Sequence, residues 1–220
     1  MFQKLSAATG LLGVLLAAPL AGQNYSRFTT HMGGGISTPL NPTGAYTGVS
    51  GNFDVGAGYN LGKNDAIIGE FMWSGLPTSI SAIHPVKAPD GKINLYTLTV
   101  NYRHQKDRIH GSPLGVYLVG GGGWYYRYSS LDKNFVVPPG TACQPIYGWW
   151  GYGCDTSGYV YSETVAYRGT SAGGVNAGAG FTLRFADSNW KFFTEARYHY
   201  AWSQRIPTTL IPVTFGIRFN

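Results

Sequence analysis

The 220-residue sequence is poor in charge and in long apolar runs. Charged residues make up 12% of the chain and aromatic residues 15%. This composition argues against disorder, because disordered segments are rich in charge and poor in aromatics. After residue 20, no stretch is apolar enough for a membrane helix, so the chain could enter a membrane only as strands. The 32 glycines also argue against a helical protein, because each costs about 1 kcal/mol inside a helix.

The first 22 residues have the pattern of a cleavable signal peptide. Lys4 supplies a positive end, residues 11–20 form an apolar run, and Ala21 and Gly22 are small, as expected near a cleavage site. The run is shorter than the roughly 20 residues of a membrane helix. Gln23 stands where a lipoprotein has its lipidated cysteine, so no lipid anchor is expected. Residues 23–220 are predicted to form one domain.

Cysteine is scarce, with two residues in the chain. Export would place Cys143 and Cys154 where disulfides persist, and we expect them to pair; two free thiols are the alternative. No metal site is expected there, because neither cysteine has a nearby histidine at ligand spacing. The glycine clusters at 33–35 and 120–123 lack the Lys-Ser/Thr of a phosphate loop, so no cofactor is expected. They suit instead the tight curvature of a small barrel.

The chain also lacks any basic run, although its formal charge is +6, or +5 once Lys4 leaves with the leader. Clustered lysines and arginines are the usual mark of nucleic-acid binding. Here they are scattered, so we expect no nucleic-acid partner, and attraction to anionic lipid headgroups is at least as plausible.

Eight segments alternate between apolar residues and small or polar ones with the two-residue period of a β-strand. They lie at about 26–37, 52–61, 67–74, 94–103, 115–128, 174–185, 190–202 and 210–219. Most are near the roughly 9–11 residues that a tilted strand needs to cross a bilayer. The connections alternate between short and long, and the longest covers about 129–170. This predicts an all-β protein, an eight-stranded antiparallel transmembrane β-barrel with short periplasmic turns and long extracellular loops.

The last segment is the clearest of the eight. Its apolar side chains alternate with a proline, a threonine, a glycine and an arginine, and they are Ile211, Val213, Phe215, Ile217 and Phe219. A soluble barrel, the alternative, would bury its apolar face inside. Aromatic residues near the segment ends favour lipid outside, because such girdles mark the membrane interfaces.

Two motifs carry a family resemblance. Residues 195–198 (EARY) and 216–219 (GIRF) resemble the last two strands of the small eight-stranded outer-membrane β-barrel superfamily, which includes the outer-membrane protein A membrane domain and the opacity-type barrels. Gly216 and Phe219 also resemble the C-terminal sorting signal of these proteins, with Asn220 following. The resemblance implies a place in the bacterial cell outer membrane, contact with its lipids and lipopolysaccharide, assembly by the barrel assembly machinery through the C-terminal strand, and a monomer. It leaves function open, because the superfamily has adhesive, structural and enzymatic members.

Several charged residues have the parity of the barrel interior, where unpaired charges are costly. They are Asp54, Glu70, Arg103, Arg127, Arg184, Glu195, Arg197 and Arg218. We expect an ion-pair network that plugs the lumen, with Glu195 bound to Arg184 or Arg218. Pairs that rearrange as a gate are the alternative, but eight strands enclose room only for side chains.

No catalytic residues are expected. His199 and Ser203 invite comparison with barrel-borne lipid A deacylases, whose His and Ser are two residues apart, but here they are four apart and His199 has interior parity. His31 is predicted to be a packing residue that faces the lumen.

The longest loop is rich in aromatic residues, which suit contact surfaces. They include Tyr147, Trp149, Trp150, Tyr152, Tyr159 and Tyr161. One interpretation is that they pack on each other above the membrane, where the alternating residues 157–168 extend the strands; the other is a binding surface for an unidentified extracellular ligand. The sequence thus predicts a non-catalytic protein with a structural or adhesin-like role, and a narrow channel or carrier is the alternative.

Overall fold

The computed structural model describes residues 26–78, 90–109, 112–185, 188–203 and 205–219; the signal peptide predicted for 1–22 lies outside them. The strands are β1 (Phe28–Pro39), β2 (Ser50–Asn60), β3 (Asp65–Pro77), β4 (Asp90–Lys106), β5 (Leu114–Val137), β6 (Gln144–Gly148), β7 (Gly151–Asp155), β8 (Tyr159–Arg184), β9 (Trp190–Ala201) and β10 (Thr208–Phe219). A 3-10 turn, η1 (Thr43–Ala45), follows β1. In the described part of the chain, nothing helical has the length and hydropathy of a membrane span.

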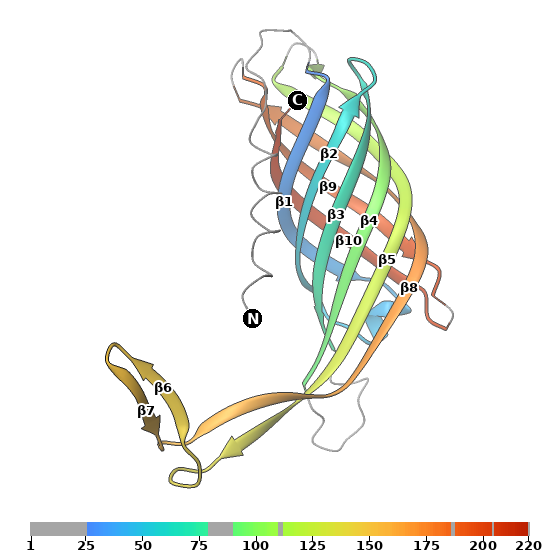
Figure 1. Ribbon diagram of the computed structural model, residues 1–220. Coiled ribbons are helices and arrows are strands. Elements are labelled where there is room, and N and C mark those ends of the chain that lie inside the picture. Colours follow the sequence, from blue (N-terminus) through green and yellow to red (C-terminus); the bar gives the residue numbers. More distant parts are fainter. Residues whose placement is uncertain (1–25, 79–89, 110–111, 186–187, 204, 220) are drawn as a thin grey trace.

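Eight of these strands close into a barrel in the order β1-β10-β9-β8-β5-β4-β3-β2, and every neighbouring pair is antiparallel (Figure 1). The seam joins the first strand to the last, from Thr30 opposite Phe219 to Pro39 opposite Leu210. Closure leaves no unpaired edge within the wall, which a strand in lipid requires. The prediction of an eight-stranded antiparallel barrel is confirmed.

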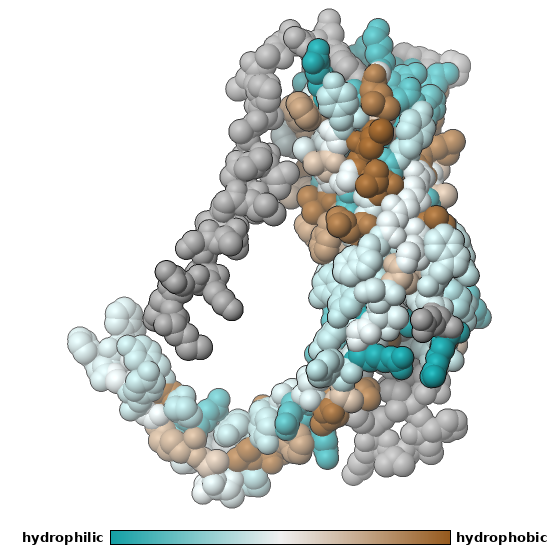
Figure 2. Space-filling view, turned by 45° about the vertical axis from the view of Figure 1, so that its right-hand side comes forward, coloured by the Kyte–Doolittle hydropathy of each residue, from teal (hydrophilic) through white to brown (hydrophobic). Residues whose placement is uncertain are grey.

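The two faces of the wall differ as the alternation predicts. On the outer face Leu118 and Val100 are 64% and 62% exposed, whereas on the inner face Arg103 and Arg218 are each 1% exposed. Apolar side chains gather on the barrel wall and hydrophilic ones at its upper end in Figure 2. This arrangement suits a barrel with lipid outside, because a charge that faces lipid is costly.

Aromatic rings gather near both ends of the outer face. At the end with the short turns, the rings of Phe28 and Tyr59 lie 5.8 Å apart and those of Trp190 and Phe219 5.3 Å apart. At the other end Tyr126 stacks on Trp124 at 5.5 Å and on Tyr96 at 6.3 Å. Strand register thus brings the predicted girdle residues into two belts.

Glycine allows a close approach at the seam, where Gly33 lies opposite Gly216. A Cβ atom on Gly216 would overlap the carbonyl oxygen of Met32 and come within 2.7 Å of the Phe193 ring. This position therefore favours a residue with no side chain, as expected for a narrow, strongly curved barrel.

The strands β5 and β8 run far beyond the barrel, with 24 and 26 residues. They remain paired to Val137 opposite Tyr159, with a register shift at Leu131/Asp132, and carry the separate β6-β7 hairpin (Figure 1). We call residues 132–164 the arm and residues 138–158 its tip. Strand pairing therefore continues through much of the long connection at 129–170, as expected if residues 157–168 extend the strands, and each strand satisfies the hydrogen bonds of the other.

Candidate functional site: the barrel lumen and the arm

The centre of the lumen holds a buried ion pair between β3 and β9. Arg197 donates from Nη1 to Glu70 Oε1 at 2.6 Å and from Nη2 to Glu70 Oε2 at 2.7 Å. Both side chains are 4% exposed. A guanidinium matches a carboxylate in this two-bond geometry, which is among the stronger polar contacts in proteins.

The second acidic residue, Glu195, contacts the same arginine. Its Oε1 lies against Arg197 Nε, and its Oε2 lies 4.0 Å from Arg218 Nη2. Arg197 therefore bridges two carboxylates. Of the two partners expected for Glu195, Arg218 is near it, whereas Arg184 binds a different acid.

Arg184 lies at the turn end because the register places it opposite Lys191, nearer the short turns than Glu195. Both cations bind Asp107, from Arg184 Nη2 at 3.1 Å and from Lys191 Nζ at 2.6 Å. This cluster lines a cavity of about 300 Å³. Asp107 was not among the predicted residues, since it follows the end of β4, where alternation no longer assigns a face.

His31 belongs to the central cluster rather than to simple packing. Its Nε2 lies 3.1 Å from Asp54 Oδ2 and 3.3 Å from Glu70 Oε2. The three residues come from adjacent strands and could in principle hold a metal ion, because their ligand atoms lie within 4.8 Å of one another. However, Arg197 already occupies both oxygens of Glu70 and would repel a cation there. The geometry therefore favours an ion-pair cluster.

Aromatic and polar side chains fill the lumen around these charges. The guanidinium of Arg218 lies 4.4 Å from the centre of the Tyr117 ring and 4.8 Å from that of Phe193, in cation–π contact. Arg103 donates to Thr29 Oγ1 at 3.3 Å. The void between Asp54, Glu70, Glu195 and Arg197 measures about 10 Å³, which is room for one water molecule at most.

An apolar layer covers the charged cluster on the side of the long loops. It consists of Met72, Leu76, Leu95, Tyr125, Ala201 and Leu210. On the side of this layer that faces the charged cluster, His199 is 1% exposed and shares a hydrogen bond of 2.9 Å with the Tyr125 hydroxyl. Ser203 lines the cavity on the other side of the layer. This layer thus lies between the His199 ring and the outer cavity.

The last predicted network residue, Arg127, lies above the apolar layer. It is half-buried and donates from Nη1 to Thr208 Oγ1 at 3.3 Å. The eight predicted charges therefore divide into six in the central part of the lumen, Arg184 at the turn end and Arg127 at the outer mouth. Parity assigned each of them to the interior, but it does not order them along the axis.

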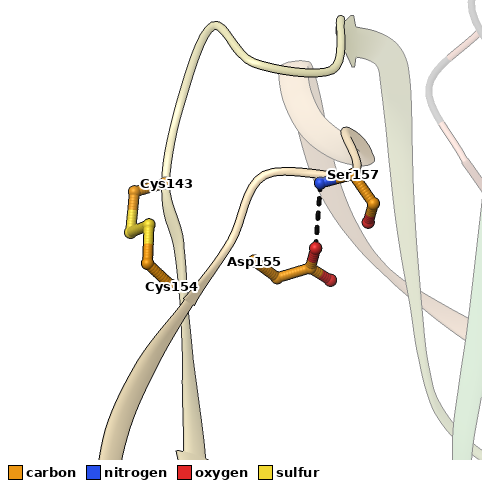
Figure 3. The surroundings of a disulfide bond; sticks show 4 residues. All are labelled: Cys143, Cys154, Asp155 and Ser157. Carbon is orange, nitrogen blue, oxygen red and sulfur yellow. Dashed lines mark hydrogen bonds between the residues drawn. A yellow bond between two sulfur atoms is a disulfide. The ribbon is translucent and has the colours of Figure 1, made fainter.

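The tip of the arm is a hairpin joined at its base by the predicted disulfide. Cys143 and Cys154 are bonded, with Cα atoms 5.3 Å apart (Figure 3). Next to them the Asp155 carboxylate accepts a hydrogen bond of 2.9 Å from the Ser157 N–H, which lowers the pKa of Asp155. The disulfide and this turn fix the base of the hairpin.

The aromatic residues of the arm divide between the two interpretations. In the stalk, which is the part of the arm outside the tip (residues 132–137 and 159–164), Tyr161 stacks on Phe135 at 5.3 Å. In the tip Tyr147 packs edge-on against Tyr152 at 5.2 Å, yet Trp149 and Trp150 are 94% and 99% exposed. Packing accounts for the stalk, and the two tryptophans form an exposed apolar edge.

No protein-family model matches the sequence, and no curated protein matches it. Among solved structures, Neisserial surface protein A superposes with a TM-score of 0.56 at 14% identity over 88% of this chain and 97% of that chain. The attachment invasion locus protein Ail of Yersinia pestis has a TM-score of 0.45 at 15% identity over 87% of this chain and 97% of Ail. The N-terminal β-barrel domain of Pseudomonas aeruginosa OprF has 0.44 at 11% over 88% and 97%. The closed strand order and the apolar outer face therefore give this chain the fold of a small eight-stranded outer-membrane β-barrel.

Proposed function

We propose that the protein is a non-catalytic barrel of the bacterial outer membrane whose arm binds an extracellular protein. The observation that carries this proposal is the near-complete exposure of Trp149 and Trp150 at a turn held away from the barrel. Tryptophan and tyrosine are enriched among the residues that dominate binding energy in protein interfaces. A disulfide-closed hairpin presents them with little conformational entropy to lose on binding.

The composition of the arm supports binding through aromatic packing rather than charge. Residues 132–164 contain seven aromatic residues, one lysine and three acidic residues. A nearly neutral surface of this kind gives little electrostatic steering. The proposed partner therefore presents an apolar or aromatic patch rather than a strongly charged one.

The packed lumen supports a role without conduction. The central void of about 10 Å³ lies between two larger cavities and is surrounded by buried charged groups. Refolded protein in a planar lipid bilayer is expected to show no steady current steps above a protein-free bilayer, with a general porin as the positive control. A reproducible conductance would favour the alternative of a narrow channel.

Replacing the tip with a short turn tests the proposed surface. Val137 and Tyr159 are register partners, so Asn-Gly in place of residues 138–158 should close the arm as an ordinary hairpin. In nanodiscs, the wild type is expected to bind at least one protein in an immobilised panel of fibronectin, laminin and collagens. The tip deletion and the pair Trp149→Ser/Trp150→Ser should each weaken that binding about tenfold or more.

Val49→Ser is the matched control, because Val49 is an exposed apolar residue near the start of β2. It should bind like wild type, and all variants should keep the heat-dependent gel mobility of a folded barrel. A folded tip deletion that binds as well as wild type would contradict the proposal. Wild-type binding to an uncharged oligosaccharide array alone, or to nothing tested, would also count against a protein partner.

A further inference from the structure

The outer mouth of the barrel contains a cavity of about 450 Å³ that is separate from the arm and from the central cluster. Its walls come from η1, from the outer ends of five strands and from the connection before β10. A second hollow of about 360 Å³ shares Tyr46, Ile93, Ser129 and Arg168 with it, so the two are contiguous. Volumes in this range are typical of small-molecule sites.

One part of the cavity wall is cationic. Arg127, Arg168 and Arg205 all line it, and the first two are close enough for their charges to interact. In the described residues, no carboxylate lines the cavity and no ion pair engages any of these three arginines. An anion in the cavity would relieve the repulsion and could accept paired hydrogen bonds from the guanidinium groups.

Another part of the cavity wall is apolar, and Leu95 in it is the register partner of Arg127. Leu76 and Leu95, 2% and 0% exposed, belong to the layer that closes the lumen below. Ile93 and Ile206 are half-buried and also line the cavity, and the adjoining hollow adds Leu131 and Ala166. A site with an apolar floor and a few convergent charges selects a ligand that has both features.

We propose that this cavity binds a single-chain amphipathic anion. The acidic headgroup, a carboxylate or phosphate, is held by the three arginines. The alkyl chain lies along Ile93 and Leu95 and continues into the adjoining hollow. The apolar layer stops the chain above the central charges, so the site retains its ligand at the surface and offers it no path through the barrel.

Displacement of a dansyl-labelled fatty acid tests this proposal on the full-length mature protein in nanodiscs, with empty nanodiscs as background. Dodecanoate and dodecyl phosphate are expected to displace the probe. Dodecanol, which lacks the charge, and inorganic phosphate, which lacks the chain, should compete at least about tenfold more weakly. Purified lipopolysaccharide is included because it carries acyl chains and phosphates in the same membrane.

Substitutions separate the two halves of the site. Arg127→Gln, Arg168→Gln and Arg205→Gln should each weaken dodecanoate about tenfold, because each removes a charge-assisted hydrogen bond. Arg27→Gln is the matched control, since Arg27 is exposed at the turn end, and it should leave the affinity unchanged. Ile206→Ser should weaken dodecanoate but not inorganic phosphate. The tip deletion should bind dodecanoate like wild type, which keeps this proposal independent of the arm.

Three results would overturn the inference. Dodecanol that competes as well as dodecanoate would reduce the site to an apolar hollow. A variant with all three arginines changed to glutamine that stays folded by its heat-dependent mobility and binds dodecanoate like wild type would show that the arginines do not hold the headgroup. If lipopolysaccharide displaced the dansyl-labelled probe and the single-chain compounds did not, the cavity would be a site for the lipopolysaccharide of the membrane instead.

Discussion

Arg197→Met is expected to lower the free energy of unfolding of the barrel by about 3–5 kcal/mol, because removal of one member of a buried ion pair leaves the other charge without compensation. Here the substitution leaves two acidic residues, Glu70 and Glu195, in a lumen with almost no room for water. Methionine has a comparable length, so the change removes the charge with little loss of packing volume. Urea titration of the protein in lipid vesicles, followed by tryptophan fluorescence, measures the effect.

Arg184→Met is the matched control. Its side chain is 24% exposed at the turn end, and Lys191 still binds Asp107 when it is removed. A partly exposed pair of this kind contributes about 0–1 kcal/mol. Adding Glu70→Gln to Arg197→Met should recover part of the loss, because residues in contact are energetically coupled. Equal losses for Arg197→Met and Arg184→Met would show that the central cluster has no special role in stability.

Removal of the disulfide is expected to make local opening of the tip about 100-fold more favourable without lowering the free energy of unfolding of the barrel. Cys143 and Cys154 are 11 residues apart, and closing so short a loop is worth roughly 3 kcal/mol in the chain-entropy model. Within the described residues, the tip connects to the barrel through the two strands of the arm, so its opening need not disturb the wall. Hydrogen exchange of residues 144–155 in Cys143→Ser/Cys154→Ser should therefore become about 100-fold faster.

The same double variant should keep the urea midpoint of the wild-type barrel. Ala142→Ser is the matched control, because it adds a hydroxyl beside Cys143 and leaves the bond intact. A drop in the barrel midpoint equal to that of Arg197→Met would mean that the arm and the barrel unfold as one unit. Unchanged exchange in the tip would mean that the β6-β7 pairing alone holds it.

The strand pattern of the sequence predicts the wall of this barrel well, because lipid and lumen impose opposite chemistry on alternate residues. Parity alone placed Arg103, Glu195 and Arg218 inside, where they are buried. To predict which interior charges form ion pairs, one also needs the register between strands, and no local sequence pattern gives that register. His31 joined Asp54 and Glu70 for this reason: the three residues are far apart in sequence but lie on adjacent strands.

The outer cavity could not be predicted from the sequence, for a different reason. Arg168 and Arg205 lie past the predicted ends of their membrane segments, so the alternation expected of a bilayer no longer assigns them a face. The same limit applied to the arm, whose strands continue in water without the lipid that set their pattern. Regions above the membrane are specified by contacts between distant segments, and these appear only in three dimensions.

The asymmetry of β8 has a consequence for the biogenesis of the protein. Within the described residues, β9 pairs with β8 only from Gly174 onward, so residues 159–172 keep one open edge in water. Open strand edges act as templates for intermolecular sheets, and natural proteins limit this with charged side chains, prolines and bulges at the edge. Glu163 and Arg168 place charges of opposite sign along this strand. They would protect the chain against aggregation during its passage to the membrane, before neighbouring copies are held apart in the bilayer.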